Sequence, residues 1–208
     1  MTLTIKRIFD ILSAFSLIIL FFPLFLIISL LIMCEDKGTP FFIQERIGKD
    51  FRIFKIIKFR TMALNSETTG TGIFTNANDI RITKVGKYLR KYSLDELTQL
   101  FNVIKGDMSF IGPRPPVTYF PYQIDEYPEK YKKRFSIKPG ITGLAQVCGR
   151  TNLTWHERFV YDIQYIEEYN LILDIKILAR TIKNIIKKKD IFPTQEFQNK
   201  NHKLSNEN

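Results

Sequence analysis

An uncharged apolar segment near the N-terminus constrains this chain more than any other feature. From Ile11 to Cys34 no residue is charged, and only three serines are polar. A helix over these residues would be about 36 Å long, which exceeds the roughly 30 Å hydrocarbon core of a bilayer. Because charged residues, and no small-residue cleavage site, follow Cys34, we expect the segment to be retained as a membrane anchor.

Pro23 stands at the centre of this segment and predicts a bend. Proline removes a backbone donor and clashes with the carbonyl of Ile19, which costs about 3 kcal/mol in a regular helix. Positive charge marks the cytoplasmic side of a membrane segment, and here it flanks both ends: Lys6 and Arg7 before, and Lys37, Arg46, Lys49, Arg52, Lys55, Lys58 and Arg60 after. We therefore expect residues 1–36 to form a re-entrant helix–break–helix hairpin broken at Pro23. A kinked single-pass anchor is the alternative.

The charge balance points to an anionic partner. The 208 residues carry 31 Lys plus Arg against 21 Asp plus Glu, a net charge of +10. Nucleic acid, a nucleotide or an acidic membrane surface would each suit this excess. Cys34 and Cys148 are far apart and only two histidines are present, so a disulfide framework or a zinc site is not indicated, and a reducing cytosol fits.

The remainder is predicted to be a compact cytoplasmic catalytic domain, residues 37–193, of the α+β class with helices predominating. Two β-prone runs, 41–44 and 51–61, form a short β-hairpin, and the polar stretch 64–78 is expected to be a mobile loop. Helical spacing of apolar residues predicts further helices over 82–92, 94–104, 155–169 and 171–189. The polar tail, residues 194–208, is predicted to be disordered.

The last of these helices carries an apolar stripe beside many basic residues. An ordinary core-packing helix with a solvated side and a helix lying on anionic lipid both fit this pattern. The sequence leaves the two readings open.

An acidic pair follows Ser93, which with Glu96 matches a capping box and predicts that a helix begins there. Asp95 and Glu96 would then lie in the first turn, where the helix dipole lowers a carboxylate pKa and keeps Asp95 ionised. First-turn acids are common, but Arg90 before the pair and Arg114 after it are the phosphate-gripping groups that phosphoryl transfer needs. Walker-type and dinucleotide fingerprints are absent.

Two other classes of function are weighed against an enzyme. A membrane-tethered nucleic-acid binder would use two short helices meeting near Ser93, but the second would present acidic and apolar side chains to DNA. A non-catalytic scaffold would not need the acidic pair. We therefore expect no nucleic-acid partner.

Six strings in order resemble one family, the monotopic bacterial phosphoglycosyl transferases, also called initiating sugar transferases. They are Lys6–Asp10, Gln44–Gly48, Phe54–Met62, Leu89–Leu97, Gly106–Pro115 and Lys138–Val147. The resemblance covers the chain to about residue 190 and is to the small, single-domain members. Many relatives have Ser before the hairpin proline, whereas this chain has Phe22, which changes how backbone freed by the bend is satisfied.

The resemblance implies transfer of a sugar-1-phosphate from a UDP-sugar to polyprenyl (undecaprenyl) phosphate, with release of UMP, as the first membrane step of bacterial glycoconjugate synthesis. Asp95 would be the nucleophile, forming an aspartyl-phosphosugar, and a ligand of Mg²⁺, and Glu96 its acid/base or positioning partner. The family's place is the cytosolic face of the bacterial inner membrane, inserted in the lipid bilayer. The implied phosphate contacts are Arg90, Arg114, Arg150, Lys58 and Arg60. The sugar, the pathway and the oligomeric state stay open.

Overall fold

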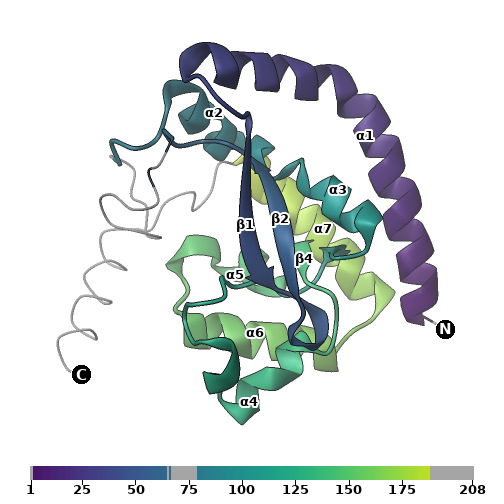
Figure 1. The fold of residues 1–208 in the computed structure, drawn as a ribbon. Helices are drawn as coiled ribbons and strands as arrows, with labels where there is room; N and C mark the ends of the chain where they lie inside the picture. The colour runs from purple at the N-terminus through teal and green to yellow at the C-terminus, as the bar shows by residue number, and fades with distance from the viewer. Residues whose placement is uncertain (1, 65, 67–78, 188–208) are drawn as a thin grey trace.

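The computed structural model describes residues 2–64, 66 and 79–187, and its helices outnumber its short strands, as predicted (Figure 1). The expected disordered tail and nearly all of the expected mobile loop lie outside these residues. The helices are α1 Thr2–Glu35, α2 Lys84–Tyr92, α3 Gln99–Lys105, α4 Glu129–Lys132, α5 Leu144–Cys148, α6 Trp155–Glu167 and α7 Leu171–Ile186. The strands are β1 Phe41–Ile47, β2 Ile53–Phe59, β3 Ser109–Ile111 and β4 Gly140–Thr142.

The N-terminal segment is one long helix instead of two arms separated by a break. α1 runs without interruption through Pro23, and Figure 1 shows that it changes direction part-way along its length. A proline commonly kinks a helix in this way, because only one hydrogen bond is lost. Within the described residues α1 is the one helix long and apolar enough to cross a membrane. Its shape alone does not confirm a re-entrant hairpin.

α1 has two different faces. Ala14, Phe25, Ile28 and Ile32 are buried in one core with residues of β2, α2 and α3. The opposite face leaves large apolar side chains uncovered, among them Ile8, Phe9, Leu12, Phe15, Ile19, Leu20, Phe22, Leu26, Ile27, Leu30 and Leu31. Such a continuous apolar surface indicates contact with lipid or protein.

The β1–β2 hairpin is antiparallel, with Phe41 opposite Phe59 and Ile47 opposite Ile53. The other edge of β2 is covered by side chains at the start of α3 and within it. Thr98 donates to the Ile57 carbonyl at 2.9 Å, and the Ile57 amide donates to Asn102 at 3.0 Å. These bonds satisfy a strand edge and fix β2 against the segment that carries the acidic pair.

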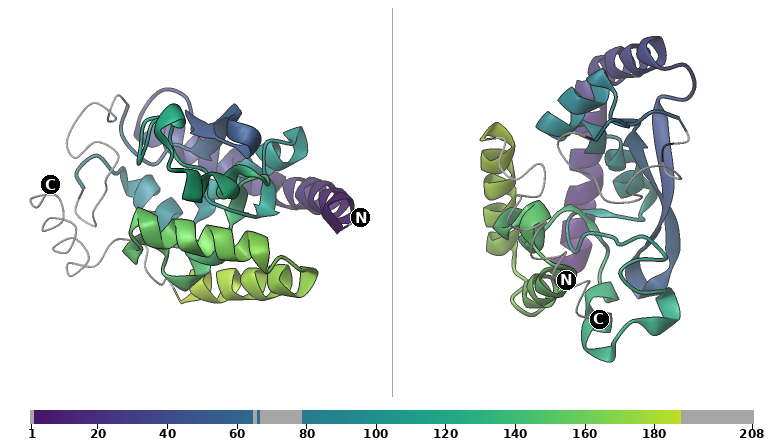
Figure 2. Two further views of the ribbon diagram at one scale, coloured as in Figure 1. Left: turned by 90° about the horizontal axis from the view of Figure 1, so that it is seen from below. Right: turned by 90° about the vertical axis from the view of Figure 1, so that its left-hand side faces the viewer.

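The C-terminal helices form the other side of the domain. α6 begins at a capping box between Thr154 and Glu157, and Tyr165 of α6 donates to Asp174 of α7 at 2.6 Å. Figure 2 shows α7 on the side of the domain away from the β1–β2 hairpin. The predicted helices over 155–169 and 171–189 are thus confirmed: both start at the predicted residue, and they end two and three residues earlier than predicted.

Candidate active site

The acidic pair lies in a tight turn between two helices. Ser93 ends α2 in the left-handed conformation, with φ of 55°, and Leu94–Glu96 form a single 3-10 turn before α3 starts at Gln99. Ser93 makes no side-chain capping bond, so the predicted capping box is wrong. The Glu96 side chain binds two cations instead.

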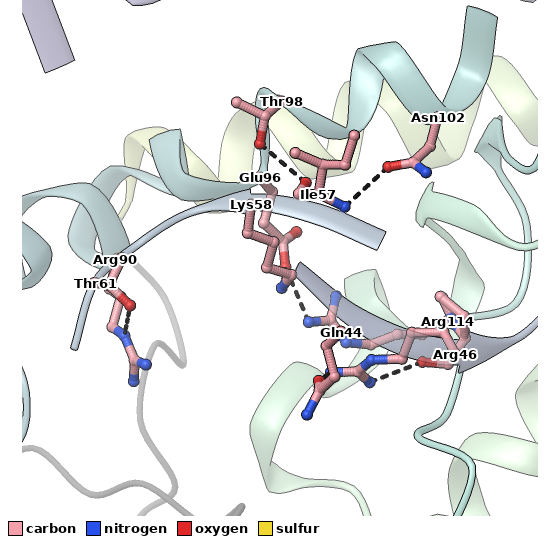
Figure 3. Close-up of polar contacts among 11 residues, drawn as sticks. Gln44, Arg46, Ile57, Lys58, Thr61, Arg90, Glu96, Thr98, Asn102 and Arg114 are labelled. Carbon is pink, nitrogen blue, oxygen red and sulfur yellow. Dashed lines mark hydrogen bonds and ion pairs between the residues drawn. The ribbon is translucent and has the colours of Figure 1, made fainter. Parts of the chain in front are cut away.

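Glu96 is held by two cations from distant parts of the chain (Figure 3). Its Oε1 accepts from Lys58 Nζ of β2 at 2.7 Å and from Arg114 Nη2 at 2.9 Å. Burial favours a raised pKa for Glu96, but the charges of Arg114 and Lys58 outweigh it and hold the pKa well below its ordinary value. Glu96 is therefore ionised and fixes both cations in place.

Asp95, the neighbouring carboxylate, is uncommitted. It is partly buried, and no other residue in the described part of the chain forms a hydrogen bond or ion pair with it. Burial raises the pKa of Asp95, Lys58 opposes that rise, and the adjacent Glu96 adds to it. The predicted lowering of the Asp95 pKa by a helix dipole is therefore wrong: no α-helix starts at Ser93, and burial raises the pKa instead.

The remaining predicted phosphate contacts fall in different places. Arg90 donates from Nε to Thr61 at 2.9 Å. Burial lowers the pKa of Arg90, and the nearby charge of Asp95 opposes that lowering. Arg60 is directed away from the pair: it donates to the backbone carbonyls of Asp36 and Lys37, at the end of α1. The side chain of Arg150 lies outside what the structure describes.

Arg114 is supported from behind by residues that the sequence reasoning did not single out. The Arg114 carbonyl accepts from Arg134 Nη2 at 2.8 Å, and Arg134 pairs with Asp162 of α6 at 2.7 Å. Arg46 of β1 donates to the carbonyl of Pro115 at 3.0 Å. The sequence did contain a signal for this support: Asp162 is a charged residue on the inner side of a predicted helix, which indicates a buried partner of opposite charge.

Further cations lie near the segment that contains Arg114 and Pro115. Burial, followed by the nearby charge of Arg114, lowers the pKa of Arg158 to about 10. Burial also lowers the pKa of Lys58, against the attraction of Glu96. Burial is the main cause in both cases, so both cations have lost hydration, and the charge of an anionic ligand would stabilise them.

A divalent cation fits this site only in a limited sense. The described residues contain no group of three or more His, Cys, Asp or Glu side chains that could hold a metal ion. Mg²⁺, however, is commonly held by one or two carboxylates together with substrate phosphates. The uncommitted carboxylate of Asp95 supplies that minimal protein share.

An apolar bent helix on a small α+β domain, with a free carboxylate among fixed cations, is consistent with a membrane-associated protein that acts on phosphate groups. Residues 1–188 match the model of the bacterial sugar transferase family, and the chain belongs to that family.

Characterised and uncharacterised relatives are similar over most of this chain. It is 44% identical to the UDP-N-acetylgalactosamine-undecaprenyl-phosphate N-acetylgalactosaminephosphotransferase of Aeromonas hydrophila, over 88% of this chain and 44% of that protein. It is 41% identical to the UDP-glucose:undecaprenyl-phosphate glucose-1-phosphate transferase of Klebsiella pneumoniae, over 85% and 39%. It is 37% identical to the uncharacterized sugar transferase EpsL of Bacillus subtilis, over 88% and 87%. The chain thus spans less than half the length of the first two relatives.

Proposed function

We propose that this protein transfers a sugar-1-phosphate from a UDP-sugar to polyprenyl phosphate, giving a polyprenyl-diphosphate sugar and UMP. The observation that carries the proposal is the uncommitted carboxylate of Asp95 beside Glu96, whose own carboxylate holds Lys58 and Arg114. The names of the Aeromonas and Klebsiella relatives describe this class of transfer for those proteins.

The proposed mechanism has two displacements at one phosphorus atom. A carboxylate oxygen of Asp95 attacks the phosphorus that bears the sugar, and the bond from that phosphorus to the bridging oxygen breaks, so UMP leaves with the bonding electrons. An oxygen of polyprenyl phosphate then attacks the same phosphorus and releases the Asp95 carboxylate. Splitting the transfer in this way is ordinary covalent catalysis.

The cations would act on charge that develops at the leaving phosphate. Lys58 and Arg114 are held by Glu96 before substrate binds, so little reorganisation is needed in the transition state. The raised pKa of Asp95 makes the free carboxylate a stronger base and nucleophile once it is ionised. Glu96 is therefore assigned a positioning role.

Magnesium is proposed as the cofactor. When bound it would neutralise charge on the transferred phosphate, and Asp95 together with substrate phosphates would hold it. Lys58 and Arg114 would then complete the neutralisation from the protein side. Loss of UMP release on chelation, restored by Mg²⁺, is the expected result.

We also propose that α1 enters the cytosolic face of the inner membrane and returns to it. Near its start, Arg7 donates to the Val103 carbonyl at 2.6 Å and Lys6 pairs with Asp174 at 2.5 Å. At its end, Glu35 accepts from the backbone amides at the start of α2 at 2.6 and 2.8 Å. Both ends are bonded to one domain, whereas a single pass would place them on opposite sides of about 30 Å of hydrocarbon.

The chemical test follows UMP release from a panel of UDP-sugars, including UDP-N-acetylgalactosamine, UDP-galactose and UDP-glucose, with polyprenyl phosphate and Mg²⁺. Asp95→Asn should abolish release, and denatured wild-type protein should carry a phosphosugar adduct on Asp95. Asp125→Asn, an exposed carboxylate elsewhere, is the matched control and should be fully active. Full activity of the Asp95→Asn variant would refute the covalent mechanism.

The membrane test uses cysteine labelling in intact spheroplasts. With Cys34 and Cys148 changed to Ser, single cysteines replace Thr4 or Lys37. A membrane-impermeant maleimide added outside should label neither, and lysis should expose both. Labelling of one position from outside would show a single pass and remove the re-entrant proposal.

A further inference from the structure

α7 presents three different faces along its length. One packs inward and contains Asp174 and Ile177. The second is apolar yet exposed, and comprises Leu171, Ile172, Ile175, Leu178, Ile182 and Ile186. The third is basic and exposed, and comprises Lys176, Arg180, Lys183 and Lys187. The apolar and basic stripes are adjacent, because Lys176, Lys183 and Lys187 each directly follow a residue of the apolar stripe, about 100° further around the helix.

The basic stripe borders an open hollow between α5, α6 and α7. The hollow has a volume of about 480 Å³, far above the roughly 10–15 Å³ that a cavity needs to hold one water molecule. α5 contributes Cys148 and α6 contributes Tyr161. α7 contributes Arg180, Lys183, Asn184 and Lys187.

The charges around this hollow are all of one sign. Its lining contains three cations and no carboxylate. Within residues 79–187 and the other described parts, none of Arg180, Lys183 and Lys187 forms an ion pair. Lys133 and Lys58, by contrast, each pair with a glutamate at 2.7 Å.

One hydrogen bond and one electrostatic interaction link α7 to α5 at the hollow. The side-chain amide of Asn184 donates to the Val147 carbonyl at 3.3 Å, which fastens α7 to α5 across the hollow. Burial raises the pKa of Cys148, and the charge of Arg180 opposes that rise, so the guanidinium lies close to the α5 wall. Arginine and lysine donors converging on one hollow match the oxygens of a phosphate group.

We propose that this hollow binds the phosphate of an anionic phospholipid headgroup. The exposed apolar stripe of α7 runs beside the basic stripe, so acyl chains and headgroup would meet one helix at once. Figure 1 shows α7 running in roughly the same direction as a line joining the two ends of α1, which suits a helix in the interface plane. This inference rests on the membrane placement under the proposed function, and not on the transfer chemistry.

Native mass spectrometry of the full chain, released from detergent with phosphatidylglycerol titrated in, tests the site. The wild type should retain one phosphatidylglycerol. Lys183→Gln and Arg180→Gln should each weaken retention about fivefold, the effect of one basic group near an anionic surface. Lys176→Gln is the matched control, since it removes the same charge from the same stripe outside the hollow, and should stay within about twofold.

Four outcomes would overturn the proposal. An equal loss in the Lys176→Gln variant would show diffuse attraction to a basic surface. Equal retention of phosphatidylcholine would show that acyl chains alone bind. Displacement of the lipid by inorganic phosphate at equal concentration would make this a soluble-phosphate site, and the absence of any retained lipid would end the idea. The Asp95→Asn variant should retain lipid normally, which separates this test from failure of the transferase proposal.

Discussion

The ion pair between Arg134 and Asp162 offers the sharpest test of how this fold supports its site. Arg134 donates from Nε and Nη2 to one oxygen of Asp162 at 3.0 and 2.7 Å, and both side chains are at most 2% exposed. Asp162→Asn would leave a buried guanidinium without its counter-charge. Breaking such a pair costs about 3–5 kcal/mol, which lowers the Tm of a chain of this size by roughly 6–20 °C.

The chain contains its own control for this experiment. Arg134 and Lys133 both lie in the 3-10 turn Lys133–Phe135, and Asp162 and Glu167 both lie in α6. Lys133 pairs with Glu167 at the same 2.7 Å, but their side chains are 50% and 55% exposed. Glu167→Gln should cost about 0–1 kcal/mol, because water screens the pair. Because the two pairs have the same separation, the difference between the two losses of stability, measured by thermal unfolding in one detergent, reports the effect of burial alone. Equal losses in the two variants would contradict the reasoning.

A double variant separates stability from function. Arg134 lies 4.9 and 4.8 Å from the rings of Phe135 and Phe159, surroundings that accept apolar side chains. Arg134→Met with Asp162→Leu should recover most of the lost stability, as apolar replacements of buried pairs do. UMP release by the double variant should nevertheless be well below that of the wild type, because the Arg114 carbonyl has lost its donor. A double variant as unstable as Asp162→Asn alone would refute this account.

Three further changes have signs fixed by the structure. Because Glu96 raises the pKa of Asp95, Glu96→Gln should move the acidic limb of the pH profile of UMP release to lower pH. Because Lys58 lowers that pKa, Lys58→Met should move the limb to higher pH, and two shifts of one sign would contradict the charge arrangement. Gly86→Ala, which in an open helix stabilises by about 0.5–1 kcal/mol, should destabilise by about 1–3 kcal/mol in thermal unfolding. Its Cβ would overlap the backbone of Thr61.

Local pattern was sufficient where a segment's partners are close in sequence. The hairpin of β1 and β2, and the helices α2, α6 and α7, follow from alternation and from helical spacing of apolar residues. The bend of α1 follows from Pro23, although the helix accommodates it without a break.

Ion pairs between residues far apart in sequence explain where the predictions from local sequence pattern were wrong. Ser93 and Glu96 match a capping box, yet Glu96 binds Lys58, 38 residues earlier, and Arg114, 18 residues later. A carboxylate gains more from two partly buried cations than from one backbone amide. Arg60 was grouped with Lys58, and side chains two residues apart in a strand lie on the same face. β2, however, ends at Phe59, so Arg60 lies outside the strand and its side chain points elsewhere.

The packing of α1 also bears on how the protein can be handled. Ala14, Phe25, Ile28 and Ile32 form part of the same core as Phe59 of the hairpin. A truncated form starting after residue 36 would expose that core to water and lose the cap that Glu35 places on α2. Removing the apolar helix α1 to obtain a water-soluble enzyme is therefore expected to yield an unfolded protein. The apolar N-terminal helix is therefore part of the fold itself, and the two cannot be separated in this chain.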